Sequence, residues 1–426
     1  MKHAGSTGPV MQDGRLRDRL SQASSDGRPV LIVTISNGAG HVRVAQGIAA
    51  AIRKTQTRVP VVVADVADYM TPLARFTHVT DYLWIVRNAP SLWDRIDRHQ
   101  KRQRHTSPEW FYRRNCRALF DLAREVRPRA LVANEVGCCE IAALVKRDLA
   151  LDVPLVAVNG DPDTDRAWVQ PEVDLYSFSD EESCEEIAHH GAPRERVRAW
   201  GSPLPEGFGE ARDHDAARRD VCMRLSLDPA LPLVLVAGGA EGLGRIEETT
   251  ARLLKLENSA PQIVVLAGRN ERLRERCERL ARGGDGRLRV LGWVGPELMA
   301  ELMFAADLAV SKLGSTFNES IAAGLPIVAL EPPPGSERMQ YRLLGEWGAG
   351  RPVRNLDEMS AVVSELLADG QKLSALRERV RARRRPDAAR RIALWLKSAL
   401  DDRTRRTPAS ERPSQREALL GAGAHA

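Results

Sequence analysis

The stretch SKLGSTFNESIAAGLPIVAL, residues 311–330, places one carboxylate between two apolar runs. Glu319 lies three residues after Thr316, in the first turn of an expected helix. A carboxylate there can accept hydrogen bonds from two neighbouring hydroxyl groups, such as those of a ribose. The same spacing fits a capping box, which satisfies backbone N–H groups and needs no ligand. The sequence leaves both interpretations open.

Two further residues carry groups that could handle a proton. His41 ends the glycine-rich turn NGAGH, and a neutral imidazole can act as a general base. Asp161 follows the apolar run 155–158, where its carboxylate could orient a hydroxyl group. A hydroxyl is a poor nucleophile unless its proton is removed, so one such base would suffice. Each side chain could instead cap a helix, and that alternative stays open.

Glycine-rich turns join an apolar run to a helix twice, in ISNGAGHVRV (35–44) and VAGGAEGLGR (236–245). N–H groups at a helix N-terminus bind anions, and glycine lets a phosphate approach closely. Glycine is also common at any tight strand-to-helix turn. The second turn lacks the G-x-G-x-x-G spacing of a nicotinamide site, so we do not expect that cofactor.

These residues must be positioned by short apolar runs that alternate with helical stretches. Uninterrupted β-branched runs of this kind indicate parallel sheets covered by helices on both faces. A Pro/Gly-rich stretch at 200–215 separates two sets of them. The expected strands are 30–35, 59–64, 130–133 and 155–158, and then 233–237, 262–267, 288–290, 308–310 and 326–330.

The predicted fold class is α/β, with two Rossmann-like, doubly wound domains that face each other across a cleft. The expected boundaries are a disordered arm at 1–28, an N-terminal domain at 29–205, a linker at 206–214, a C-terminal domain at 215–385, a helix at 386–402 that packs back across the seam, and a disordered tail at 403–426.

Composition excludes several classes of protein. The 426 residues are 43% hydrophobic, but no apolar run approaches the ~18 residues that span a bilayer, and the first residues lack the apolar core of a secretory signal. Six cysteines without a C-x-x-C pair suit a reduced cytoplasm. A calcium-binding loop is also not expected at DPDTDRAWVQPE, because Arg166 stands where the sharp turn of such a loop needs glycine.

The net charge of +6 is uneven, and residues 75–129 combine basic residues with Trp84, Trp93 and Trp110. Such a segment fits an anionic membrane surface, although its aromatic residues could equally form a helical core. A nucleic-acid partner is not expected, because no RNP, zinc-finger or helix-turn-helix signature is present.

Residues 292–330, GWVGPELMAELMFAADLAVSKLGSTFNESIAAGLPIVAL, resemble the C-terminal half of a GT-B glycosyltransferase. The similarity is greatest to the group of monogalactosyldiacylglycerol synthases and processive diacylglycerol glucosyltransferases, which is related to the lipid II-forming N-acetylglucosaminyltransferase. NGAGHVRVAQGIAAAI, YLWIVRNAPSLWDRI and GDPDTDRAWVQPEVDLYSFSDEE resemble further blocks of this group. The likeness keeps its order over residues 29–370.

The resemblance implies an inverting enzyme that moves a hexose or N-acetylhexosamine from a UDP-sugar to a diacylglycerol-like or lipid-linked hydroxyl. It implies a peripheral protein on the cytoplasmic face of the cell membrane that needs no metal or cofactor. His41 is then the expected base near the anomeric carbon, with Asp161 as the second catalytic candidate. The implied UDP-sugar site consists of Gly38, Gly40, Gly238, Gly239, Gly242, Trp293, Val294, Gly314, Ser315, Thr316, Glu319 and Gln340.

The resemblance also implies which part of the UDP-sugar each set of residues binds. The glycine turns take the diphosphate, the backbone near Trp293 and Val294 the uracil, Glu319 the ribose and Gln340 the sugar hydroxyls. The chain departs from the group on the acceptor side, where Glu135 and Asp165 stand in place of histidines. A non-catalytic relative that binds a nucleotide sugar, or an enzyme with a soluble acceptor, therefore remains an alternative.

Overall fold

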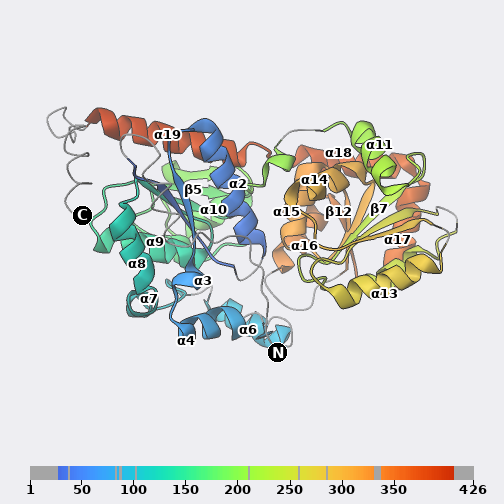
Figure 1. The fold of residues 1–426 in the computed structure, drawn as a ribbon, viewed down its shortest axis with the longest axis horizontal. Coiled ribbons are helices and arrows are strands. Elements are labelled where there is room, and N and C mark those ends of the chain that lie inside the picture. Colours follow the sequence, from blue (N-terminus) through green and yellow to red (C-terminus); the bar gives the residue numbers. More distant parts are fainter. Residues whose placement is uncertain are drawn as a thin grey trace, which may run out of the picture.

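The structure, a computed structural model, describes residues 27–36, 39–81, 84–85, 89–100, 103–209, 212–257, 260–284, 286–330 and 337–406. Gly38 lies outside the described residues, as do positions 1–26 of the predicted arm and 407–426 of the predicted tail. The two sets of apolar runs form two separate six-stranded sheets, each with helices on both faces (Figure 1).

The first sheet has the strand order β2-β1-β3-β4-β5-β6, and every neighbouring pair is parallel. Its central strands are buried along their whole length, because helices cover both faces. The strands are β1 (Val30–Thr34), β2 (Val61–Asp65), β3 (Ala130–Ala133), β4 (Leu155–Val158), β5 (Leu175–Phe178) and β6 (Val197–Ala199).

The helices of this first domain include a group between β2 and β3 that lies at one end of the domain (Figure 1). The described helices of the whole first domain are α2 (Ala39–Thr55), α3 (Val66–Tyr69), α4 (Pro72–Arg75), η1 (Phe76–Thr80), α6 (Pro90–Gln100), α7 (Glu109–Asn115), α8 (Arg117–Val126), α9 (Val136–Asp148), η2 (Arg166–Trp168), α10 (Glu181–His189) and η3 (Arg194–Arg196).

The second sheet has the order β12-β11-β10-β7-β8-β9 and is also parallel throughout. The short helix η4 (Glu206–Phe208) lies in the connection between the domains. The strands are β7 (Leu233–Ala237), β8 (Gln262–Leu266), β9 (Leu288–Leu291), β10 (Leu308–Ser311), β11 (Ile327–Leu330) and β12 (Gly350–Val353).

The helices of the second domain cover both faces of its sheet (Figure 1). They are α11 (His214–Leu225), α12 (Ile246–Leu253), α13 (Glu271–Arg282), α14 (Pro296–Ala305), α15 (Ser315–Ala323), α16 (Arg338–Glu346), α17 (Leu356–Ala368) and α18 (Gly370–Ala382).

Each sheet reverses its strand order at one point, between β1 and β3 in the first and between β7 and β10 in the second. In open parallel sheets the loops diverge at such a point, which opens a crevice at the carboxyl ends of the strands. The turns that carry His41 and Glu319 follow β1 and β10. The fold thus puts both candidate residues at crevices of this kind.

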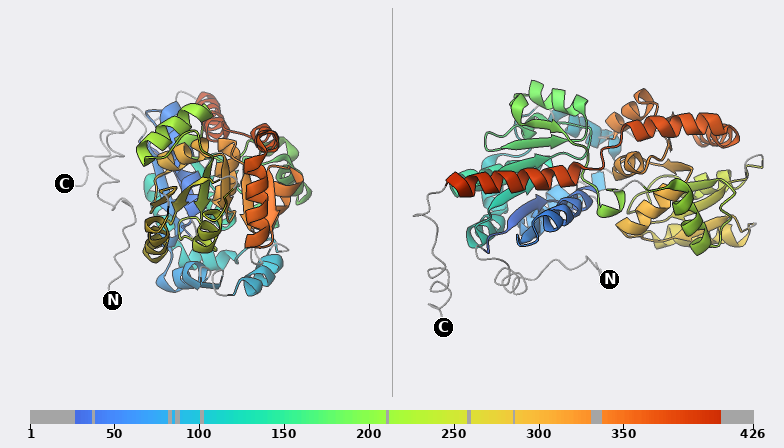
Figure 2. Two further views of the ribbon diagram at one scale, coloured as in Figure 1. Left: turned by 90° about the vertical axis from the view of Figure 1, so that its right-hand side faces the viewer. Right: turned by 90° about the horizontal axis from the view of Figure 1, so that it is seen from above.

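The last helix, α19 (Ala388–Arg406), returns to the first domain and runs along α2, as the view from above shows (Figure 2). Ile392 and Leu396 are fully buried in a core that they share with Ile48 and Ile52 of α2. The helix continues to Arg406, four residues beyond the end expected from the sequence. The chain's last described segment therefore stabilises its first domain.

Replacement of Leu396 by alanine should lower the free energy of unfolding by about 2–5 kcal/mol, because it leaves a cavity in a closely packed core. Leu394, on the same helix, is 43% exposed and provides the matched control. Denaturant unfolding should show a much smaller effect for Leu394→Ala. Equal losses for the two variants would contradict the packing of α19 described here.

Candidate functional site

The N-termini of α2 and α15 meet across the cleft between the domains. A side-chain carbon built on Gly40 would lie 3.5 Å from Cβ of Ser315, which is ordinary contact distance. Both helices follow the strand at which their sheet reverses order, β1 and β10. Two helix N-termini, each with partial positive charge, thus share one crevice.

Glu319 lies at the fifth position of α15, two residues further in than a capping box requires, and only 1% of it is exposed. The helix begins at Ser315 with Gly314 as its N-cap, and no side chain caps it. Thr316 is therefore the second helical residue and cannot form the capping box. The capping-box interpretation of Glu319 is therefore wrong.

Glu319 instead forms a buried ion pair with a residue of the other domain. Nη1 of Arg43, on α2, donates to Oε1 of Glu319, while Oε2 is buried and has no hydrogen-bond partner within the described part of the chain. Burial raises the pKa of the Glu319 carboxyl, and the Arg43 guanidinium opposes that rise. A carboxylate with one oxygen that lacks a hydrogen-bond partner is thus held between the domains.

The Arg43 guanidinium also lies over the ring of Trp293, 5.5 Å from its centroid, and Arg269 lies 4.4 Å from the same ring. Trp293 follows β9 and is 44% exposed, whereas Val294 beside it is buried in the core of the second domain. The backbone expected to hold the uracil is therefore anchored by Val294, next to a partly exposed aromatic ring.

His41 is the third residue of α2 and contacts Asn134, which follows β3, in two ways. Its Nδ1 lies 3.2 Å from the carbonyl oxygen of Asn134, and Asn134 Nδ2 donates to the His41 carbonyl at 2.5 Å. A carbonyl only accepts, so Nδ1 carries the proton. In the neutral ring, Nε2 then has the free electron pair that a base needs.

Asp161 and Gln340 come from different domains and lie together in the same crevice. Gln340 Nε2 donates to Asp161 Oδ1 at 3.3 Å, while its Oε1 accepts from Gly314 N at 2.6 Å. Asn318 Nδ2 donates to the carbonyl of Gly160 at 2.8 Å. The turn before α15 is thus tied to the loop that carries Asp161.

Local geometry explains why glycine occupies the three predicted positions after β7, Gly238, Gly239 and Gly242. A side chain on Gly238 would lie 2.3 Å from the carbonyl oxygen of Leu243, and one on Gly242 would lie 2.6 Å from that of Ala267. Gly239 has a φ of +69° and faces open space. Gly239 therefore leaves an accessible backbone, while Gly238 and Gly242 shape the turn.

A buried carboxylate holds the loop before α7 in the acceptor-side domain. Glu140 accepts from Tyr112 Oη at 2.9 Å, from both N and Oγ1 of Thr106, and from His105 Nδ1. Burial raises the pKa of Glu140 to about 7, although these hydrogen bonds oppose the rise. Glu135, one of the departures noted above, caps α9 through Cys138 N.

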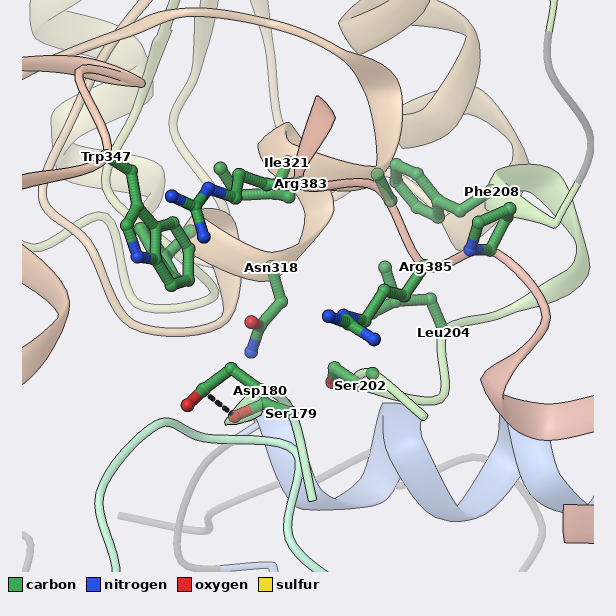
Figure 3. Close-up of a pocket in the computed structure, with 14 residues that line it drawn as sticks. Ser179, Asp180, Ser202, Leu204, Phe208, Asn318, Ile321, Trp347, Arg383 and Arg385 are labelled. Atoms are coloured by element: carbon green, nitrogen blue, oxygen red, sulfur yellow. Dashed lines mark hydrogen bonds between the residues drawn. The ribbon is translucent and has the colours of Figure 1, made fainter. Parts of the chain in front are cut away.

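A small cavity of about 40 Å³ lies between the domains beside α15 (Figure 3). Asn318 lines it together with Ser179, Asp180 and Arg385, and Ser179 donates to Asp180 within it. Asn318 thus connects the wall of this cavity to the loop that carries Asp161. Across the described residues, no group of three or more His, Cys, Asp or Glu side chains could hold a metal ion.

Sequence reasoning missed three residues of this site: Arg43, Asn134 and Asn318. Arg43 stands out as a cation in the otherwise small and apolar start of α2, HVRVAQGIAAA, and that contrast was a usable signal. The importance of Asn134 and Asn318 depends on contacts with residues 93 and 158 positions away. No local pattern could have indicated those contacts.

Removal of either member of the Arg43–Glu319 pair should destabilise the protein by about 3–5 kcal/mol, because the other charge stays buried without a partner. Arg43→Gln combined with Glu319→Gln should cost less than the sum of the two single changes. Lys54→Gln, which breaks the exposed pair with Glu206, is the control and should have little effect. Additive losses in denaturant unfolding would contradict the pairing.

The family model of Monogalactosyldiacylglycerol (MGDG) synthase matches residues 41–204. A processive diacylglycerol beta-glucosyltransferase of Bacillus mycoides is 26% identical over 372 residues, which cover 85% of this chain and 92% of the relative. The enzyme of the same name from Bacillus licheniformis is 24% identical over 361 residues, 83% of this chain and 90% of the relative.

Solved structures show the same fold at low sequence identity. MurG of Acinetobacter baumannii has a TM-score of 0.54 and 12% identity, with 87% of this chain and 99% of that chain covered. A UDP co-structure of MnaA from S. aureus has a TM-score of 0.58 and 14% identity over 91% and 99% of the two chains. The chain therefore has the GT-B fold, and its resemblance to the monogalactosyldiacylglycerol synthase and processive diacylglycerol glucosyltransferase group is confirmed.

Proposed function

We propose that this protein transfers a hexose or N-acetylhexosamine from a UDP-sugar to a hydroxyl of a diacylglycerol-like or lipid-linked acceptor, with inversion at the anomeric carbon. The observation that carries the proposal is the buried Glu319, whose Oε2 has no hydrogen-bond partner among the described residues, between the domains of a GT-B fold. The similarity to named diacylglycerol glucosyltransferases over 85% of the chain supports the lipid acceptor.

In this mechanism the donor lies mainly on the second domain. Glu319 accepts hydrogen bonds from the ribose, the uracil lies at the backbone of Trp293 and Val294, and the diphosphate lies at the glycine turn after β7. Gly40 and the turn Gly314–Thr316 contribute helix N-termini to the same anion. Gln340, now tied to Asp161, exchanges that bond for hydroxyl groups of the sugar.

The acceptor hydroxyl attacks the anomeric carbon from the side opposite the diphosphate. The new carbon–oxygen bond forms while the bond to the diphosphate oxygen breaks, and UDP leaves with the electron pair. Nε2 of His41 takes the hydroxyl proton, because Asn134 holds the proton of Nδ1 on the other side of the ring. Asp161 orients the attacking hydroxyl.

The proposed acceptor comes from the inner face of the cell membrane, where the protein binds peripherally. Large apolar side chains are exposed on the helical group between β2 and β3, namely Leu73, Phe76, Trp84, Leu92 and Trp110. Exposed arginines lie on the same segment, so apolar and basic groups can bind an anionic bilayer together. The described residues contain no helix that is long and apolar enough to cross a membrane.

The direct test incubates the purified protein with UDP-glucose, UDP-galactose or UDP-N-acetylglucosamine and vesicles that contain diacylglycerol. A glycolipid should form with at least one donor, and the anomeric configuration of the product should be inverted. UDP binding without any glycolipid would favour the non-catalytic alternative. A product found only on a water-soluble acceptor would contradict the lipid assignment.

Replacement of His41 by asparagine should lower the transfer rate by about 10²–10⁴-fold, the usual contribution of a positioned base. UDP affinity should change little, because the nucleotide lies mainly on the second domain. His41 is the third residue of α2 and so cannot be its N-cap. If His41 only held the Asn134 carbonyl, the asparagine amide could also donate to that oxygen and the variant would stay active. His189→Asn, at an exposed position on α10, is the control. An active His41→Asn enzyme would make Asp161 the next candidate base.

Vesicle binding should require anionic lipid and weaken as salt rises, because exposed charges are screened over about 10 Å at 0.1 M. Arg98→Gln with Arg104→Gln should weaken sedimentation with such vesicles, and Trp84→Ser with Trp110→Ser should do the same. Arg279→Gln with Arg282→Gln, exposed on α13, is the matched control. Binding that ignores both lipid charge and salt would contradict this surface.

A further inference from the structure

Arg43 carries more hydrogen-bonding capacity than its surroundings use. A guanidinium has five N–H donors, and within the described part of the chain the one hydrogen-bond partner of Arg43 is Glu319. The residue is nonetheless only 9% exposed, at the wall of the crevice between α2 and α15. Its Nε and Nη2 atoms are partly solvent-accessible, so they can contact an acceptor that enters from solution.

Glu319 has the complementary deficit, because its Oε2 is buried without a partner among the described residues. A ribose offers two neighbouring hydroxyl donors, and a carboxylate that receives them side by side uses one oxygen for each. Oε1 already accepts from Arg43. A ribose hydroxyl at Oε1 would therefore compete with the guanidinium for that oxygen.

We propose that Arg43 exchanges Glu319 for the diphosphate of the donor when the nucleotide binds. This inference rests on the proposed function, and it assigns to the acceptor-side domain a residue that binds the donor's leaving group. The diphosphate is bonded to the same ribose that displaces the guanidinium. The anion therefore arrives within reach of the cation that the ribose has released.

Through this exchange, the contact of Arg43 depends on whether a negatively charged diphosphate is bound. The ion pair keeps the buried Glu319 carboxylate from being unpaired. In the donor complex, the planar guanidinium can contact two phosphate oxygens and stabilise the negative charge that grows on the departing UDP. After transfer, loss of UDP restores the pair with Glu319.

The test compares the affinities of uridine and UDP, because only UDP carries the diphosphate. Arg43→Gln should reduce the preference for UDP over uridine by about 10- to 100-fold, the loss of a charge-assisted hydrogen bond. Uridine affinity should not fall, because the guanidinium no longer competes for Glu319. Glu319→Gln should instead weaken uridine and UDP by the same factor. Calorimetric titration of the wild type and both variants with each ligand measures all six constants.

Two further variants keep the test informative. Arg43→Lys retains the charge beside Glu319 in case the glutamine variant unfolds, and it should lose part of the UDP preference because it lacks the planar fork. Arg53→Gln removes an exposed arginine from the same helix and should leave the preference unchanged. Melting curves confirm that each titrated variant is folded.

The outcomes separate this inference from the proposed function. If Arg43→Gln weakens uridine and UDP equally, or leaves the UDP preference intact, Arg43 only supports Glu319 and the inference is overturned. Binding of neither ligand by the wild type would overturn the inference together with the uridine site. The expected affinity pattern without any sugar transfer would sustain the inference and refute the enzymatic proposal.

Discussion

The arrangement of this cleft depends on one buried ion pair between the domains. Glu319 is too deeply buried to keep its charge alone, since an unpaired carboxylate in such a place would cost several kcal/mol. Arg43 supplies the countercharge from α2 of the first domain. The contact between the domains and the chemistry of the candidate donor site therefore involve the same atoms.

The fold explains why these side chains meet. Both sheets reverse their strand order beside the strand whose following turn carries a candidate residue, β1 for His41 and β10 for Glu319. The crevices that result face each other, and Asn318 and Gln340 connect the second domain to the loop of Asp161. Polar groups from two chain segments far apart in sequence thus meet between the domains.

Much of the fold was predictable because a parallel sheet buried on both faces requires continuous apolar runs. The strands at 130–133, 155–158 and 233–237 were predicted with the limits that the structure has. The strand at 197–199 was missed, because VRA is short and carries an arginine at the sheet edge. The strand at 350–353, GRPV, was missed because glycine and proline rarely occur in strands.

The candidate site was less predictable than the fold. Glu319 was recognised because it is a lone carboxylate between two apolar runs, and the glycine turns have a local signature. The choice between a capping box and a ligand-binding carboxylate depended on where α15 begins, and sequence fixes helix ends only to within a residue or two. The partner of Glu319 lies 276 residues away, a relation that only the folded chain creates.

The central claim is that a uridine nucleotide binds at the place where Arg43 and Glu319 now pair. A crystal structure of the wild-type protein with UDP measures this directly. The account predicts both ribose hydroxyls within hydrogen-bond distance of the Glu319 oxygens, and the Arg43 guanidinium on the diphosphate. UDP bound elsewhere, with the Arg43–Glu319 pair intact, would contradict it.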